Sequence, residues 1–213
     1  TFSIGIKDES SDLIFAREGA AHIGSTHHEI YFTAEEALNA MEDVIYHLES
    51  CDITSVRASI CNFLLARKIQ SYGIKMVLSG EGSDEVLGGY LYFHQAPSDE
   101  EHQMECKMRV MDLGYFDCLR TDKSLLGNSV EGRYPFLDTE FVKLCINLHK
   151  DVKCQKGIEK YIVRKAFDIL DTPQSRQRYL PENVLYRQKC QFSNCGSNHC
   201  DTLKQFAERE IDD

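Results

Sequence analysis

The sequence predicts an α/β fold in which a parallel sheet with flanking helices is followed by a mostly helical C-terminal half. Over residues 1–96, short apolar runs typical of strands alternate with helical patterns in the order strand, helix, strand, helix, helix, strand. From residue 97 onward the spacing is helical and no comparable strand pattern follows. A chain of 213 residues, 42% of them hydrophobic, is long enough for one sizeable core. We therefore expect residues 1–96 to form a partial α/β sheet region and residues 97–213 to form a helical part of the same domain.

The elements of the first half are bounded by start and stop signals. Gly24 is expected to end one helix, and residues 33–36 form a capping box that opens another. The apolar run at 75–78 follows Gly73 and predicts a buried strand. The predicted elements are strands over 1–6, 28–32 and 75–78 and helices over 12–23, 33–47 and 55–72.

Helical spacing dominates the second half. Residues 176–185 include Pro181 and predict a loop. The remaining patterns are expected to form a helical cap beside the sheet, with helices over 100–113, 115–126, 139–148 and 158–170.

The composition argues against several classes of function. A net charge of −10 disfavours broad binding to nucleic acid or to an anionic membrane. No apolar run approaches the roughly 20 residues of a membrane span, and no signal-peptide pattern occurs, so we expect a soluble, cytoplasmic protein. Nine cysteines without a pairing pattern fit reduced intracellular thiols. The tail residues do not have the spacing of a structural zinc site, although they include Cys190, Cys195, His199 and Cys200.

The polar turn after the third predicted strand concentrates the chemistry of the chain. Two glycines within residues 79–85 allow backbone N–H groups to converge on an anion, and Ser83 or Asp84 is expected to cap a following helix. The turn also carries three carboxylates, at Glu81, Asp84 and Glu85. Such a set suits Mg²⁺ held between carboxylate and phosphate, or a carboxylate that accepts a proton. A polar strand-to-helix loop capped by Asp84 is the alternative that spacing alone leaves open.

Several motifs follow one another in order along nearly the whole chain. The turn itself has the sequence Ser-Gly-Glu-Gly-Ser-Asp-Glu, and the others lie at residues 1–5, 27–30, 52–59, 88–94, 131–138 and 187–189. Together they resemble the synthetase domain of the glutamine-hydrolysing asparagine synthetase family. The resemblance implies a sheet of the adenine nucleotide alpha hydrolase-like, ATP-pyrophosphatase type in residues 1–96.

The resemblance implies an ATP-dependent ligase. In this family ATP adenylates the side-chain carboxylate of aspartate and releases pyrophosphate, and ammonia derived from glutamine then attacks β-aspartyl-AMP to give asparagine and AMP. ATP and Mg²⁺ are thus the implied cofactors, and aspartate and ammonia the implied substrates. A separate N-terminal glutaminase domain would supply the ammonia. No nucleic acid or membrane is implied as a partner, and monomer and homodimer both stay open.

The resemblance also implies roles for individual residues. Glu81 matches the glutamate at the base position, and Asp84 matches the aspartate that holds Mg²⁺ and pyrophosphate. Lys189 matches the lysine that neutralises pyrophosphate in the transition state, and Asp117 an aspartate that orients the substrate. Matches to ATP and the adenylation step are Ile4 against adenine, Ser79, Gly80, Gly82 and Ser83 in the turn, and Thr54 and Arg57 in a polar segment.

Each of these matches has a plainer structural alternative. The alternatives are core packing for Ile4, solvated side chains for Glu81, Arg57 and Lys189, and an ion pair with Arg120 within one helix for Asp117.

The sequence also departs from the family pattern. Cys190 stands where the family has a glutamate after the lysine, which leaves the ordering of that loop open. A pyrophosphate loop of the form Ser-Gly-Gly-x-Asp-Ser and a glutaminase domain do not occur in these 213 residues. We therefore expect a fragment that does not form β-aspartyl-AMP by itself. A β-lactam synthetase-like adenylating enzyme and a non-catalytic degenerate copy are the alternatives.

Overall fold

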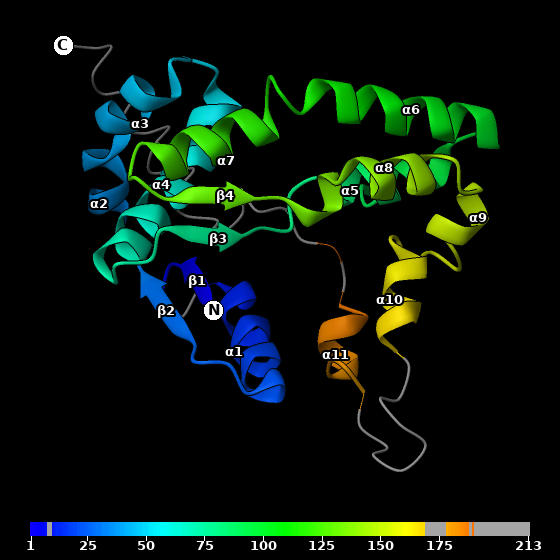
Figure 1. The fold of residues 1–213 in the computed structure, drawn as a ribbon, viewed down its shortest axis with the longest axis horizontal. Helices are drawn as coiled ribbons and strands as arrows, with labels where there is room; N and C mark the ends of the chain where they lie inside the picture. Colours follow the sequence, from blue (N-terminus) through cyan, green and yellow to red (C-terminus); the bar gives the residue numbers. More distant parts are fainter. Residues whose placement is uncertain (8–9, 169–177, 188, 190–213) are drawn as a thin grey trace. The chain divides into compact units, whose positions relative to one another are not determined.

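The structure is a computed structural model, and it describes residues 1–7, 10–168, 178–187 and 189. Figure 1 shows its helices and strands. The chain divides into two compact units, and each is described here by itself. Within the described ranges, the first unit comprises residues 1–77 and 119–132, and the second comprises residues 78–118, 133–168, 178–187 and 189.

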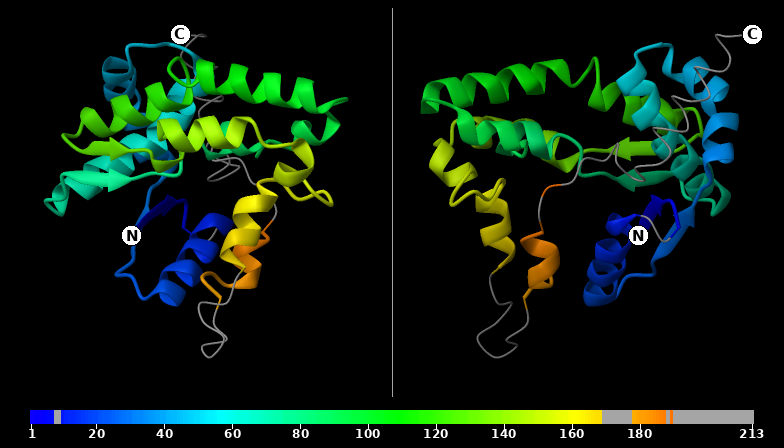
Figure 2. Two further views of the ribbon diagram at one scale, coloured as in Figure 1. Left: turned by 45° about the vertical axis from the view of Figure 1, so that its right-hand side comes forward. Right: turned by 180° about the vertical axis from the view of Figure 1, so that it is seen from behind.

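The first unit contains a pair of parallel strands. β1 (Phe2–Gly5) pairs with β2 (His28–Tyr31), and Ile4 lies opposite Ile30 in this register. α1 (Ser11–Ile23) connects the two strands and packs against β1, and both views of Figure 2 show the helix beside the strands. The strands and the helix between them confirm the prediction for this part of the chain.

The predicted helix over 33–47 is divided into two. The capping box is present, because Thr33 and Glu36 exchange side-chain and backbone hydrogen bonds at the start of α2 (Ala34–Asn39). α3 (Met41–Leu48) then begins after Ala40. Asn39 has a weak helix preference, and it immediately precedes the break. Nevertheless the apolar stripe continues through both helices, so the predicted buried face is retained.

α4 (Ile53–Ser71) supplies much of the core of the first unit. The Asp52 carboxylate caps it by accepting a hydrogen bond from the Ser55 N–H at 2.7 Å. Its apolar face packs against β1, α2 and α3. The buried cluster that results consists of Ile4, Phe32, Ala37, Val44, Ile60, Cys61 and Phe63.

A second pair of strands lies where the chain passes between the units. β3 (Met76–Leu78) pairs with β4 (Glu131–Arg133), and the flanking Ser79 N–H donates to the Arg133 carbonyl at 2.8 Å. β4 corrects the expectation that no strand follows residue 97. Its sequence, Glu-Gly-Arg, has no strand pattern, and it is extended because it pairs with β3.

The expectation that β3 is buried is also wrong. Val77 packs against the first unit's second apolar cluster, but Met76 and Leu78 are 48% and 71% exposed. Successive side chains of a strand point to opposite faces, and the described residues cover only one face of this two-stranded sheet.

The second unit is helical. α5 (Ser83–Leu87) packs against α6 (Asp99–Asp112) and α8 (Thr139–Ile146), around Val86, Leu87 and Cys145. The other elements of the second half are η1 (Leu91–Gln95), α7 (Asp117–Leu126, most of which belongs to the first unit), η2 (Pro135–Leu137), α9 (Lys150–Lys153), α10 (Tyr161–Phe167) and α11 (Glu182–Leu185). Helices therefore occur within all four predicted stretches.

Two boundaries in the second unit differ from prediction. α10 begins at Tyr161 rather than at residue 158, because Gln155 and Ile158 form a β-bridge and Lys160 has a φ of 54°. α11 replaces part of the loop predicted over 176–185; Pro181 stands before its first turn, a position that proline tolerates. Residues 169–170, 176–177 and the cysteine-rich tail with Cys190, Cys195, His199 and Cys200 lie outside the described residues.

The sequence predicts no membrane-crossing helix. In the part of the chain that the structure describes, no helix is both long and apolar enough to span a bilayer.

Candidate active site

The turn after β3 is shaped by one glycine. Gly82 is the N-cap of α5 and has a φ of 85°, so the expectation that Ser83 or Asp84 caps the helix is wrong. A side chain at this position would meet steric resistance from its own backbone, and its Cβ would lie 2.2 Å from Leu137 Cδ2. The Ser83 N–H bonds the Gly80 carbonyl at 3.3 Å, which makes the turn compact. The turn therefore places Asp84, the second residue of α5, in the first turn of this short helix.

Asp84 is contacted by two lysines from distant parts of the second unit. Lys160 Nζ lies 3.0 Å from Asp84 Oδ1, and Lys189 Nζ lies 2.9 Å from Oδ2. The same Lys160 ammonium donates to Ser83 Oγ at 3.0 Å. Each carboxylate oxygen therefore has its own cation, and one carboxylate with two ammonium groups leaves a net charge of +1 at this point. We call Asp84, Lys160 and Lys189 the lysine–aspartate cluster.

Burial and charge act in opposite directions on the cluster. Burial raises the pKa of Asp84, but the ammonium groups of Lys160 and Lys189 together outweigh it and hold the carboxyl below its ordinary pKa. Burial, assisted by the charge of Lys189, lowers the pKa of Lys160, although Asp84 opposes this. The carboxylate therefore stays ionised at neutral pH.

Gly89 provides the space in which the cluster forms. A Cβ there would lie 2.0 Å from Asp84 Oδ1 and 2.4 Å from Lys160 Cε. It would also lie 2.8 Å from the Asp84 Cα, and relief of this contact would require the backbone of α5 to shift. The absence of a side chain at residue 89 is therefore a condition for the contact between Lys160 and Asp84.

Glu85 and Tyr90 form a second polar pair beside the cluster. The Tyr90 hydroxyl donates to Glu85 Oε1, and Glu85 is only 3% exposed. Burial raises the pKa of Glu85, and the nearby Asp117 and Asp84 charges add to the effect, whereas the Tyr90 hydrogen bond opposes it. The Lys189 ammonium lies 5.6 Å from the centre of the Tyr90 ring, within cation–π range. Tyr90 thus touches both the buried carboxyl and one of the two lysines.

The other predicted residues of the second unit lie in or near this turn. Ser79 and Glu81 are partly buried, Gly80 is exposed, and the Glu81 N–H bonds Ser79 Oγ at 3.4 Å. Asp117 begins α7 and is close enough to influence the pKa of Glu85. The functional roles expected for Glu81, Asp117 and Ser79 stay predictions.

Three predicted residues belong to the first unit. Ile4 is 5% exposed and lies in the core cluster, as its structural alternative expects. Thr54 is exposed in the first turn of α4, and Arg57 follows one turn later. The Arg57 Nε is buried and has no hydrogen-bond partner among the described residues. A guanidinium with an unused buried donor is suited to an oxyanion, but contact of these three residues with a nucleotide stays a prediction.

Lys160, Gly89 and Tyr90 are not among the residues to which the sequence assigns a role, and Glu85 enters the sequence analysis only as one of three carboxylates in the turn. Lys160 lies far from the turn in sequence, and a lysine after a glycine-containing loop carries no signal of its own. Its left-handed backbone, with a φ of 54°, is uncommon for a residue with a side chain and is visible only in the structure. Glu85 stands out in the sequence as a third carboxylate, but its burial cannot be read from the turn.

The cluster suits a diphosphate together with Mg²⁺. Within the described ranges, no group of three or more His, Cys, Asp or Glu side chains could hold a metal. Mg²⁺ usually binds one or two carboxylates together with substrate phosphates and water rather than a full protein cage. Asp84 Oδ1 is buried and lacks a well-oriented hydrogen bond despite the nearby Lys160 charge, so one carboxylate oxygen has coordination capacity left. The donor set therefore fits Mg²⁺ only when phosphate oxygens complete it.

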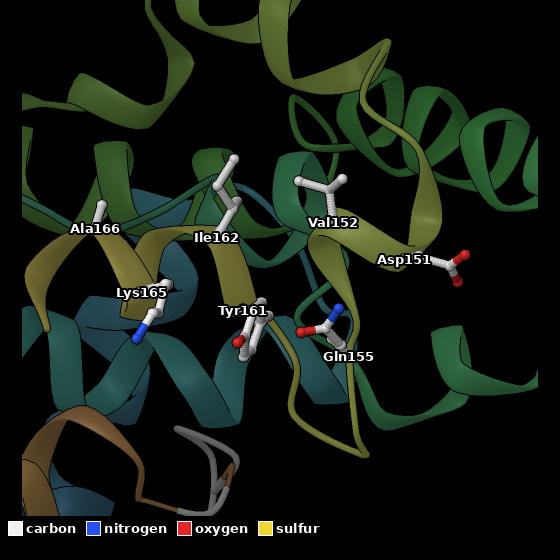
Figure 3. Close-up of a pocket in the computed structure, with 7 residues that line it drawn as sticks. All are labelled: Asp151, Val152, Gln155, Tyr161, Ile162, Lys165 and Ala166. Carbon is white, nitrogen blue, oxygen red and sulfur yellow. The ribbon is translucent and has the colours of Figure 1, made fainter.

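A shallow groove lies elsewhere in the second unit. Its volume is about 390 Å³, and Figure 3 shows the side chains that line it on and between α9 and α10. The lining residues are Asp151, Val152, Gln155, Tyr161, Ile162, Lys165 and Ala166, none of which belongs to the lysine–aspartate cluster. We therefore do not assign the groove to the candidate site.

Comparison with known proteins assigns the chain to a family. A family model described as asparagine synthase matches residues 1–109 and 96–213, and so covers the whole chain. The chain belongs to the asparagine synthase family. This confirms the family that the ordered motifs indicated.

Relatives named as glutamine-hydrolysing asparagine synthetases are similar over 100% of this chain. Asparagine synthetase 1 of Saccharomyces cerevisiae is 52% identical over 218 residues, which are 38% of its length. The probable asparagine synthetase of Dictyostelium discoideum is 48% identical over 220 residues, or 39% of its length, and that of Zea mays is 47% identical over 218 residues, or 36%. The chain thus spans less than two fifths of the length of these relatives.

Proposed function

We propose that this chain is the synthetase part of a glutamine-hydrolysing asparagine synthetase. In the proposed reaction an oxygen of the aspartate side chain attacks the α-phosphorus of ATP, and the bond to the β-phosphate oxygen breaks to release pyrophosphate. Ammonia then attacks the acyl carbon of β-aspartyl-AMP, and AMP leaves as asparagine forms. The observation that carries the proposal is the convergence of Lys160 and Lys189 on Asp84 beside a glycine-rich turn.

The lysine–aspartate cluster is proposed to receive the departing diphosphate. Pyrophosphate leaves with several negative charges, and the cluster presents two ammonium groups that can exchange a carboxylate partner for phosphate oxygens. Mg²⁺, when bound through Asp84, would supply further positive charge to those oxygens. Because the lysines are already held in place, they need little reorganisation when charge develops.

The remaining roles concern the acyl group and the nucleotide. Glu81 is proposed to accept a proton from the attacking ammonia, and Asp117 to orient the aspartate substrate. Ser79, Gly80, Gly82 and Ser83 would contact ATP largely through backbone groups. In the first unit, Arg57 would neutralise phosphate with its unpaired Nε, and Thr54 and Ile4 would contact the nucleotide.

Supply of the nitrogen and the cellular setting complete the proposal. Ammonia would come from glutamine, hydrolysed by a glutaminase domain such as the names of the relatives imply. The cysteines in the described part of the chain are free thiols, which fits a reducing compartment, and we place the protein in the cytoplasm.

A chimera tests the proposal. This chain would replace the matching 218 residues of the yeast relative, with circular dichroism and a cooperative thermal unfolding transition of the replaced part as the control for folding. We expect formation of AMP and asparagine that depends on aspartate and ammonia, and we expect Lys189→Ala to lower it at least tenfold. A chimera whose replaced part is folded but that forms no AMP would contradict the proposal and indicate a non-catalytic copy. AMP formation that aspartate does not stimulate would indicate a different acyl substrate, as in a β-lactam synthetase-like enzyme.

A further inference from the structure

One arginine connects the two chain segments that carry the lysines of the cluster. Arg164, in α10, donates from Nη1 to the carbonyls of Leu185 at 2.6 Å and Arg187 at 3.2 Å. It also donates from Nε to the Glu159 carbonyl at 2.7 Å and from Nη2 to Glu159 Oε1 at 2.5 Å. Figure 2 shows α10, in yellow, and α11, in orange, beside each other in both views. All these atoms belong to the second unit.

The partners of Arg164 are the neighbours of Lys160 and Lys189. Glu159 immediately precedes Lys160, and its side chain and carbonyl are both bonded to the guanidinium. The carbonyls of Leu185 and Arg187 belong to the end of α11 and the residues after it, and Arg187 is two residues before Lys189. A shift of Arg164 would therefore release both segments at once.

The hydrogen bonds of Arg164 are shielded from solvent and use several N–H groups of its planar guanidinium. The side chains of Arg164 and Glu159 are only 13% and 5% exposed. Charge-assisted hydrogen bonds in such surroundings are stronger and less screened by salt than surface pairs. A lysine could make one or two of these bonds, but it could not reach the four acceptors in fixed directions.

We propose that Arg164 is a positioning residue that holds Lys160 and Lys189 against Asp84 and thereby sets the affinity of the cluster for diphosphate. The inference rests on the proposed function for its ligand, but the placement of the two lysines can be measured without any ligand. A purely structural role would predict lost stability without altered lysine placement.

The first experiment measures the binding of inorganic pyrophosphate with Mg²⁺ to the 213-residue chain by calorimetry. Arg164→Lys is expected to weaken binding about tenfold, and Glu159→Gln, which keeps the shape of the partner, less than that. In the Lys189→Ala background the effect of Arg164→Lys should shrink, because the lysine it positions is gone. An equal fold-loss in both backgrounds would overturn action through Lys189. Arg17→Lys is the matched control, because Arg17 also makes a two-pronged pair, with Glu29 in the first unit.

The second experiment measures the rates at which Lys160 and Lys189 undergo reductive methylation, read by peptide mass spectrometry with circular dichroism to confirm folding. Arg164→Lys should raise both rates severalfold, while exposed Lys143 reacts at the wild-type rate. Unchanged rates together with a lowered melting temperature would overturn the proposal. If the wild-type chain bound no pyrophosphate, the proposed function would fail at that point, and the methylation rates would still decide the role of Arg164.

Discussion

Lys189 Nζ lies 2.9 Å from Asp84 Oδ2, although the two residues are far apart in the sequence. The contact is possible because α5 starts at Gly82 and so presents Asp84 in its first turn, and because Gly89 leaves the other carboxylate oxygen open to Lys160. Two cations then converge on one anion. Such a pair of ammonium groups is prepared for a ligand that carries more negative charge than a single carboxylate, and a diphosphate is such a ligand.

Removing either lysine should weaken the binding of pyrophosphate to the chain. Each ammonium contributes a charge-assisted hydrogen bond of about 1.5–3 kcal/mol, so Lys160→Ala and Lys189→Ala should each raise the dissociation constant about 10- to 100-fold. Isothermal titration calorimetry provides the measurement. Lys143→Ala is the control, because Lys143 forms an exposed pair with Glu140 within α8. Equal affinities for all three variants would exclude the cluster as the binding site.

A methyl group at residue 89 should disrupt the cluster. Gly89→Ala places its Cβ 2.0 Å from Asp84 Oδ1 and 2.8 Å from the Asp84 Cα, and we expect a loss of stability of about 1–3 kcal/mol and at least tenfold weaker pyrophosphate binding. Gly114→Ala is the matched control in the same unit, because an added Cβ there has nothing within 4 Å. Urea denaturation and calorimetry measure the two effects. A Gly89→Ala variant as stable and as tightly binding as Gly114→Ala would show that Asp84 and Lys160 do not meet over residue 89.

Two substitutions of Tyr90 should have different effects on the stability of the chain and on its affinity for pyrophosphate. Tyr90→Phe keeps the ring near Lys189 but removes the hydroxyl that bonds buried Glu85, so we expect about 1–3 kcal/mol lower stability with pyrophosphate affinity close to wild type. Tyr90→Leu also removes the ring and should lower both. Tyr92→Phe is the comparison, because Tyr92 is 45% exposed and bonds Glu105. If the two substitutions at residue 90 lowered affinity equally, the ring would have no part in holding Lys189.

His102 should make the stability of the chain sensitive to acid. It is fully buried beside Cys106 and Cys154, and burial, with the charge of Lys153, lowers its pKa from the ordinary 6.5 to about 4. Between these values the unfolded chain binds a proton on this imidazole and the folded chain does not, so stability falls as the pH decreases from 6.5 to 4.

Melting temperatures of the wild type and His102→Asn over this range test the expectation. The variant should lose stability overall, but its melting temperature should depend less steeply on pH than that of the wild type. His22→Asn, at the half-buried last turn of α1, is the comparison variant for a histidine outside this buried cluster. If the melting temperatures of His102→Asn and wild type fell in parallel with pH, protonation of His102 would not be the cause of the acid sensitivity.

Local signals in the sequence are sufficient for most elements and for part of the site. The Thr33 capping box, the helix end at Gly24 and the strand before Ser79 each depend on neighbouring residues, and each is present. Motifs are sufficient to single out Asp84 and Lys189. The sequence does not reveal β4 or the exposure of Leu78, because both depend on which strands pair and which face is covered. Lys160 and Arg164 escape prediction for a related reason, because their partners lie in other elements. Lys160 meets Asp84 in α5, and Arg164 bonds carbonyls at and after the end of α11.

The most direct test of the proposed diphosphate site is calorimetric titration of the 213-residue chain with inorganic pyrophosphate, with and without Mg²⁺, for the wild type and Asp84→Asn. We predict that Mg²⁺ strengthens binding to the wild type about tenfold or more. Asp84→Asn should bind metal-free pyrophosphate at least as tightly as the wild type, because both lysines are released from the carboxylate, but it should gain nothing from Mg²⁺. A wild-type chain that binds no pyrophosphate would contradict binding of diphosphate by the lysine–aspartate cluster. An equal Mg²⁺ effect in both proteins would contradict binding of Mg²⁺ through Asp84.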